Sequence, residues 1–296
     1  MTEAEPNWEF YRSFLAVLRE GSLSGAARAL GLAQPTVGRH IDALEGALGL
    51  ALFTRSQLGF LPTEAAAELR PYAETLASTA AALLRAASSQ GGVRGAVRIT
   101  ASETIGAEVL PPILRDLHQA HPELAIELVL SNRVENLLRR EADIAVRMVP
   151  PEQEALIARH IGAVPLGFHA HRAYLDRRGR PQSLDDLAGH AIIGFDQENA
   201  FTRSLKAQLG PLDRRLFALR TDSELAHLAA IRAGFGIGVC QLGIARRDPN
   251  LEHVLAEQFS VKLDTWLAMH EDLRDSPRCR AAFAALAEGL TRYVRG

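Results

Sequence analysis

The stretch "AARALGLAQPTVGRHIDALE", residues 26–45, has the pattern of two short helices joined by a tight corner. Gly31 suits the left-handed residue that ends a first helix. Pro35 suits the first turn of a second helix, where its missing N–H would have no partner anyway. In that second helix Val37 and Ile41 lie four residues apart, which places them on one buried face. The stretch therefore predicts a helix-turn-helix.

The opposite face of the second helix bears on DNA binding. In a helix-turn-helix the second helix enters the major groove, and its first turns meet base edges. An ordinary corner between two helices of a bundle would show the same spacing, so the pattern alone leaves both interpretations open. On the first interpretation the candidate DNA-binding residues are Ser24, Gln34, Pro35, Thr36, Arg39, His40 and, from the segment that follows, Arg55.

The charge of this region is unusual for a DNA-binding domain. Residues 1–62 contain five arginines and six acidic residues, and the whole chain has a net charge of −2. Phosphate contacts also come from hydroxyls, backbone N–H groups and helix N-termini, which need no net charge. Electrostatic neutralisation nevertheless supplies much of the affinity, so one copy would bind weakly. We therefore expect a dimer or a larger assembly.

The next segment, "LALFTRSQLGFLPT", has the pattern of a strand, a turn and a second strand, with Gly59 in the turn region. A hairpin after a helix-turn-helix is a wing. Arg55 would lie on this wing, within reach of a phosphate or of a narrow, negatively charged minor groove. The alternative for Arg55 is a solvated surface charge.

A long helix is expected to begin after Thr63, which is a good N-cap, and to end at the Ser/Gly linker "SSQGGVRG". Pro71 should kink this helix or delay its regular start by a turn. Leucine and alanine alternate along it at heptad spacing, which favours a dimerisation helix over one that packs on its own domain. The seam residues are Leu69, Ala73, Leu76, Ala80, Leu83 and Ala87.

From Gly95 onward short apolar strands alternate with helical segments, the pattern of an α/β fold with a largely parallel sheet. Ligands in such folds bind at strand carboxyl ends and at helix N-termini. The segments that follow the strands therefore supply candidates for an effector-binding cleft. These are Ser102, Glu103, Thr104, Asn132, Arg133, Met148, Val149, Phe195 and Asp222.

A small carboxylate would suit the first of these segments, because Ser102 and Thr104 stand at an expected helix N-terminus. Glu103 would repel an anion unless it points away or pairs with Arg133 or Arg147. Each candidate has an alternative as an ordinary loop residue or cap, and the absence of any effector also stays open. No further cofactor is expected.

Several other chemistries lack the residues that they need. The two cysteines form no CxxC pair, which fits a reducing cytosol. No nucleophile elbow, P-loop or zinc-protease motif occurs, so we expect no enzyme activity. Two histidine pairs have spacings seen in metal sites, but no cysteine or nearby acid completes a set, so no metal is expected. These pairs are His118 with His121 and His169 with His171.

The N-terminal stretch "MTEAEPNWEF" contains acidic residues and no apolar run, so we do not interpret it as a signal peptide. The longest apolar stretches fall far short of the roughly 18 residues that span a membrane. We therefore expect a cytoplasmic protein with no membrane partner.

Several stretches together closely resemble LysR-type transcriptional regulators. They are "FLAVLREGSLSGAARALGLAQPTVGRHIDALEGALGLALFTRSQLGFLPTEA" and, downstream, "GAVRIT", "LPPILRDLHQAHPELAIEL", "READIAVRM", "TDSELAHLAAIRAGFGIGV" and "HEDLRDSPRCRAAFAAL". The resemblance covers nearly the whole chain. It departs from the family at Gly38, where a serine is usual, and at Ala66 or Ala67, where a glycine is usual.

The resemblance implies a sequence-specific DNA-binding regulator with an all-α winged helix-turn-helix, a long linker helix and an α/β effector domain. That domain would resemble periplasmic solute-binding proteins, with two Rossmann-like subdomains crossed twice by the chain and an effector cleft between them. The expected boundaries are 1–62 for the DNA-binding domain, 63–93 for the linker and hinge, and 94–296 for the effector domain, with subdomain I at 94–165 and 269–296 and subdomain II at 166–268.

Expected partners are double-stranded DNA, a small-molecule effector and RNA polymerase. The linker helix would pair two subunits, and two such dimers commonly form a homotetramer in this family. The alternative is a small-molecule binding module or an enzyme whose N-terminal helices serve assembly.

Overall fold

The computed structural model describes residues 5–56, 59–87, 92–132, 142–151, 156–197, 202 and 214–296. The described residues form two compact units, one that runs up to Leu84 and one that begins at Arg85. Each unit has its own hydrophobic core.

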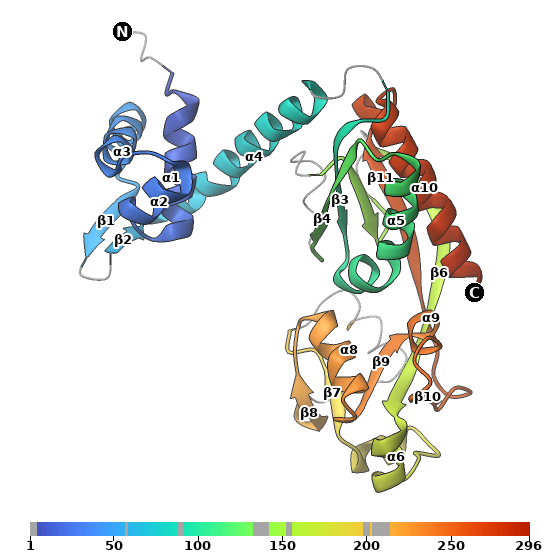
Figure 1. The fold of residues 1–296 in the computed structure, drawn as a ribbon. Helices are drawn as coiled ribbons and strands as arrows, with labels where there is room; N and C mark the ends of the chain where they lie inside the picture. The colour runs from blue at the N-terminus through green and yellow to red at the C-terminus, as the bar shows by residue number, and fades with distance from the viewer. Residues whose placement is uncertain are drawn as a thin grey trace. The chain divides into compact units, whose positions relative to one another are not determined.

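The described part of the N-terminal unit contains three short helices, a hairpin and most of a long fourth helix (Figure 1). The short helices are α1 (Trp8–Glu20), α2 (Leu23–Leu30) and α3 (Gln34–Leu48), and strands β1 (Phe53–Ser56) and β2 (Gly59–Pro62) pair antiparallel. Buried side chains from all three helices form the core. This arrangement is the expected helix-turn-helix with a following wing, although Gly59 opens the second strand rather than lying in the turn.

The ends of these helices follow from local sequence. Asn7 caps α1 by accepting a hydrogen bond from Glu9 N, and Ser22 caps α2 by accepting one from Gly25 N. Gly21 and Gly31 end α1 and α2 with φ of 64° and 66°, a region that glycine enters without a steric penalty.

Helix α4 (Glu64–Ala87) follows the hairpin, and Thr63 Oγ1 accepts a hydrogen bond from Ala66 N at its start. The helix continues through Pro71 as one element. Leu69 and Ala73, two of the expected seam residues, pack on the core of the N-terminal unit. For these two residues the structure thus shows packing on their own domain, which was the alternative to a dimer seam. Farther along, Leu76 and Leu83 are 47% and 66% exposed.

The C-terminal unit is built on one mixed sheet with the strand order β4-β3-β5-β11-β6-β9-β7-β8, and β10 pairs with β6. One lobe contains β3 (Gly95–Ala101), β4 (Leu124–Leu130) and β5 (Ile144–Arg147). The other contains β7 (Ile192–Gly194), β8 (Phe217–Arg220), β9 (Ile237–Gln241) and β10 (Leu251–Val254). Two long strands, β6 (Leu156–His171) and β11 (Val261–His270), pair with each other and belong to both lobes (Figure 1).

Strand direction differs from the expected largely parallel sheet. Within each lobe β3 pairs parallel with β4 and β5, and β7 pairs parallel with β8 and β9. The pairs made by β6 and β11 are antiparallel, because these strands carry the chain between the lobes in opposite directions. The sheet is therefore mixed.

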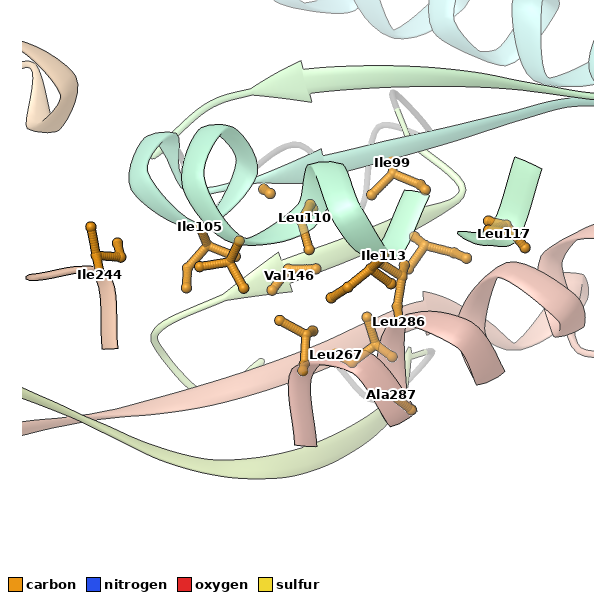
Figure 2. Packing of buried hydrophobic residues seen from close by; sticks show 14 of the residues in the cluster. Ile99, Ile105, Leu110, Ile113, Leu117, Val146, Ile244, Leu267, Leu286 and Ala287 are labelled. Carbon is orange, nitrogen blue, oxygen red and sulfur yellow. The ribbon is translucent and has the colours of Figure 1, made fainter. Parts of the chain in front are cut away.

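Helices cover the sheet and complete the lobes. A π-helical turn, η1 (Ile105–Val109), leads into α5 (Leu110–Ala120), which has Pro111 and Pro112 in its first turn. Figure 2 shows Ile113 of α5 among Leu286 and Ala287 of α10 (Pro277–Arg295). The remaining helical elements are α6 (Arg172–Arg178), η3 (Asp185–Gly189), η4 (Arg214–Leu216), α8 (Glu224–Arg232), α9 (Leu242–Ala245) and η5 (Glu271–Leu273).

In the described part of the chain, no helix is both long enough and apolar enough to cross a membrane.

Candidate nucleic-acid interface and effector cleft

The candidate DNA-binding residues of α2 and α3 lie largely on the surface. Ser24, Gln34, Pro35 and Arg39 are exposed, and Thr36 is half-buried. Arg39 Nη2 donates to Thr36 Oγ1 at 3.4 Å, one turn earlier on α3. Helix α3 begins after Ala33, which provides no side-chain cap. Pro35 has no N–H, and Thr36 N and Val37 N donate to Ala33 O at 2.9 and 3.2 Å.

His40 does not point freely outward, which differs from the sequence expectation. Its Nδ1 lies 2.8 Å from Ser13 Oγ on α1, and its ring packs on Phe10 with centroids 5.2 Å apart. The ring is therefore held between α3 and α1, where it fixes the angle of α3.

Gly38 lies in the first half of α3, where the family usually has serine. A Cβ built at this position would meet Leu23 Cδ1 at 3.8 Å, an ordinary contact. Space therefore does not require glycine there.

Arg55 lies on the wing strand β1, opposite Phe60 of β2. Its backbone is within the described structure, and its side chain is not.

A cleft of about 400 Å³ lies between the two lobes of the C-terminal unit. It is lined by seven of the nine candidate effector residues, namely Ser102, Thr104, Asn132, Met148, Val149, Phe195 and Asp222. The strand ends and the start of α8 thus converge as the α/β pattern predicts. Arg133 lies outside the described residues.

Glu103, the remaining candidate, is turned toward the other lobe. Its Oε2 accepts hydrogen bonds from Ser223 Oγ at 2.9 Å and from Leu225 N at 3.4 Å, at the N-terminus of α8. Among the described residues the carboxylate forms no pair with Arg147, and Asn132 Oδ1 accepts a hydrogen bond from the Glu103 backbone N–H.

Asp222 is not the plain N-cap of α8. Ser223 occupies the cap position, and its side chain accepts from Ala226 N. Asp222 Oδ1 instead accepts from Asp196 N and Gln197 N at 3.1 and 2.8 Å, which holds the segment after β7 at the rim of the cleft.

Arg147, at the end of β5, lines the cleft and is 6% exposed. Nη2 donates to Thr100 Oγ1 at 2.9 Å and Nη1 to Val146 O at 3.0 Å. Among the described residues Arg147 Nε has no hydrogen-bond partner, and no carboxylate forms an ion pair with the guanidinium. Burial lowers the pKa of Arg147 to about 10, so the side chain still carries its positive charge at neutral pH.

Glu224 and His227 of α8 also line the cleft. Thr104 N donates to Glu224 Oε2 at 3.2 Å, and burial raises the pKa of this carboxyl. The His227 ring stacks on Phe195 at 5.4 Å, and burial lowers its pKa to about 4. Neither ring nitrogen of His227 has a hydrogen-bond partner in the described structure.

Two family models match the chain. Residues 8–67 match "Bacterial regulatory helix-turn-helix protein, lysR family", and residues 90–291 match "LysR substrate binding domain". The chain belongs to the LysR family of transcriptional regulators. It is a DNA-binding regulator with an effector-binding domain, and the alternative of a binding module or enzyme with assembly helices is not favoured.

Curated relatives include transcriptional regulators from two organisms. The chain is 31% identical to the transcriptional regulator CrgA of Neisseria meningitidis serogroup C (strain 8013), over 98% of this chain and 99% of that protein. It is 32% identical to a transcriptional regulator of Xanthomonas campestris pv. campestris (strain 8004), where the match spans 62% of this chain and 53% of that protein.

Solved structures of LysR-type regulators share the fold. The structure of CrgA from Neisseria meningitidis matches with a TM-score of 0.60 at 25% identity, over 97% of this chain and 99% of that one. The structure of CbnR, a LysR family regulator, matches with a TM-score of 0.69 at 21% identity, over 98% and 100% of the two chains.

Sequence reasoning did not assign several cleft residues of this LysR-type regulator. Arg147 was considered only as a partner for Glu103, although a charge that ends an apolar strand is a usable signal. Glu224, His227 and Gln241 carried no such signal, because one position on a helix or strand does not reveal which side faces a cleft.

Proposed function

We propose that this chain binds operator DNA as a dimer through α3 and the wing, and that a small organic carboxylate in the cleft switches its effect on transcription. The observation that carries the effector class is Arg147. A buried positive charge that no carboxylate of the described structure neutralises is unfavourable on its own, and a bound anion would relieve it.

The surroundings of Arg147 favour the same ligand. Ser102, Thr104 and Asn132 offer polar groups to a carboxylate or to a second polar end of the effector. Glu103, which would repel an anion, is engaged at the start of α8. The stacked Phe195 and His227 rings supply a flat wall for the body of the molecule.

The DNA contacts follow from the exposed face of α2 and α3. Arg39 and Gln34 would reach base edges, while Ser24, Thr36 and Pro35 would lie against phosphates. His40 would act by positioning α3 against α1, and Arg55 would extend from the wing. A structure of full-length CbnR with its target DNA matches this chain with a TM-score of 0.66.

Assembly would use α4, where Leu76 and Leu83 are exposed at heptad spacing. Paired dimers would form a homotetramer. An effector that binds two states of this assembly unequally would shift their populations, alter the spacing or bend of the DNA and change contact with RNA polymerase. Such a regulator would work in the cytoplasm, where bacterial DNA lies.

Footprinting tests the DNA half of the proposal. Purified protein at stated salt should protect a roughly palindromic site in the intergenic region beside its own gene. Arg39→Ala should abolish the protection, and Arg12→Ala, an exposed arginine of α1 that pairs with Glu9, should leave it unchanged. Equal protection by the Arg39→Ala variant would disprove the assigned face.

Thermal shift tests the effector half. Acetate, benzoate and succinate are compared with their neutral amides, and at least one carboxylate should raise the Tm while its amide does not. Arg147→Met, which keeps the length and removes the charge, should abolish the shift, and Arg147→Lys should retain part of it. A shift that survives in Arg147→Met would contradict the role of Arg147.

A further inference from the structure

A second cavity, of about 440 Å³, lies in the C-terminal unit between α5, α9 and α10. It shares no lining residue with the effector cleft. Val109, Pro112 and Ile113 form an apolar wall on the α5 side. Figure 2 shows this part of α5, with Ile113 directed toward α10.

The opposite side of this cavity is positively charged. Arg246 and Arg247 follow α9, and Arg292 lies near the end of α10. Asp116 also lines the cavity, but Arg115 Nη2 contacts its Oδ1 at 2.6 Å. The acidic member of the lining is therefore already paired with an arginine from α5.

The three arginines differ in what holds them. Arg247 Nη1 donates to Glu108 O at 2.7 Å, and the guanidinium lies 5.4 Å from the centre of the Tyr293 ring. Arg246 and Arg292 are exposed, and neither forms a hydrogen bond or an ion pair with another described residue. Two guanidinium groups thus face the cavity with all their donors available.

We propose that this cavity is a second ligand site, for an organic monoanion with an apolar body. Its carboxylate would bind Arg246 and Arg292, since the planar guanidinium fork matches a carboxylate. Its hydrocarbon part would lie against the wall formed by Val109, Pro112 and Ile113. Val109 and Ile113 are already buried, so the contact would mainly remove Pro112 from water.

The second site is tied to the effector cleft through Tyr293. This side chain lines the second cavity, and its hydroxyl donates to Gln241 Oε1 at 2.7 Å. Gln241 is buried and lines the effector cleft. A ligand beside the Tyr293 ring would therefore alter the position of a cleft residue, which gives the regulator a second input. This coupling, unlike binding itself, rests on the proposed effector function.

Equilibrium dialysis of the full chain with radiolabelled hexanoate tests the site. Hexanoate should bind the wild type, and Arg246→Ala combined with Arg292→Ala should weaken binding by at least ~10-fold, the loss expected for one charge-assisted hydrogen bond. Arg295→Ala is the matched control, because Arg295 is exposed on the same helix turn and does not line the cavity. Arg147→Met changes the effector cleft and not the second cavity, so hexanoate binding that this variant retains takes place at the second cavity.

Three outcomes would overturn the proposal. The first would be that hexanoate fails to bind the wild type. The second would be that binding is lost in Arg147→Met and kept in the double variant. The third would be that inorganic phosphate displaces labelled hexanoate as well as unlabelled hexanoate does. The last result would mean that the apolar wall contributes nothing. Loss in the double variant, with retention in Arg295→Ala and Arg147→Met, supports the proposal.

Hydrogen exchange tests the coupling separately. Hexanoate should change the exchange of amides in residues 237–241 of the wild type. Tyr293→Phe keeps the ring and removes the hydroxyl, so it should retain hexanoate binding and lose that change. An unaltered exchange response in Tyr293→Phe would disprove the coupling and leave the binding site standing.

Discussion

Arg232 of α8 and Glu108 of η1 form a bidentate ion pair between the two lobes, with Nη1–Oε1 at 2.6 Å and Nη2–Oε2 at 2.8 Å. Just before η1, Thr104 N donates to Glu224 and Glu103 accepts from Ser223, at the start of α8. The segment from Glu103 to Glu108 is thereby linked to both ends of α8 beside the effector cleft. The structure thus represents a state in which the lobes are held together by their own side chains.

The first prediction concerns this ion pair. Glu108→Gln should lower the Tm of the effector domain at pH 7 by about 2 °C, because a partly exposed pair contributes roughly 0.5–1 kcal/mol. The arginine lowers the pKa of Glu108 below 4.5, so the stabilisation is present at neutral pH and is lost as the pH falls through that lowered pKa. Calorimetry should show that the difference in Tm between the wild type and Glu108→Gln disappears below pH 4.5. Glu257→Gln, a control at an exposed position, should have the same Tm as the wild type.

The second prediction concerns buried histidine. Burial lowers the pKa of His227 to about 4, below its ordinary value of 6.5, so protonation favours the unfolded chain. The free energy of unfolding should fall as the pH drops from 6.5 toward 4, by up to about 1.4 kcal/mol per pH unit for this group.

Urea unfolding between pH 7 and pH 4.5 measures that slope. His227→Leu should flatten it, and His118→Leu, at an exposed position, should not. Part of the slope should remain in His227→Leu, because burial also lowers the pKa of His169 to about 4. Identical slopes in the wild type and the His227→Leu variant would contradict the burial argument.

The third prediction concerns glycine in the recognition helix. Gly38→Ala should stabilise the N-terminal unit by about 0.5–1 kcal/mol, since alanine is the better helix former and its Cβ has room. Gly46→Ala, later on α3 with no atom within 4 Å of its Cβ, should stabilise it equally. Urea unfolding measures both, and a destabilised Gly38→Ala variant would show that the α2–α3 contact is tighter than described.

The fourth prediction concerns α4. Leu83→Glu should dissociate the proposed dimer in sedimentation velocity, because a charge would enter an apolar seam. Ala81→Glu introduces the same side chain two residues away, at an exposed position off that seam, and should leave the dimer intact. Dissociation by both variants, or by neither, would rule out the seam.

Features of the fold that depend on neighbours in sequence could be predicted. Gly21 and Gly31 end their helices and Ser22 caps α2, because caps and left-handed ends are decided within a few residues. The ends of parallel strands likewise predicted where the cleft lies, since the chain must leave each strand at the same edge of the sheet.

Features that depend on distant contacts could not. His40 was expected on the outer face, but its ring nitrogen contacts Ser13, which is 27 residues away in the sequence. Glu103 engages the start of α8, which lies 120 residues downstream. Side-chain partners of this kind are chosen by how elements pack, and no local pattern of residues encodes them.

The β6–β11 pair, which joins the two lobes, contains a β-bulge. Thr265 pairs with Gly162 and the next residue, Trp266, pairs with His160, so one residue of β6 is left over, next to a glycine with φ of 141°. Extra residues of this kind increase the local twist of a strand pair. The two strands that join the lobes therefore have an irregular, more twisted site between the lobes. A change of twist at this site would rotate one lobe against the other without a change in the strand pairing within each lobe.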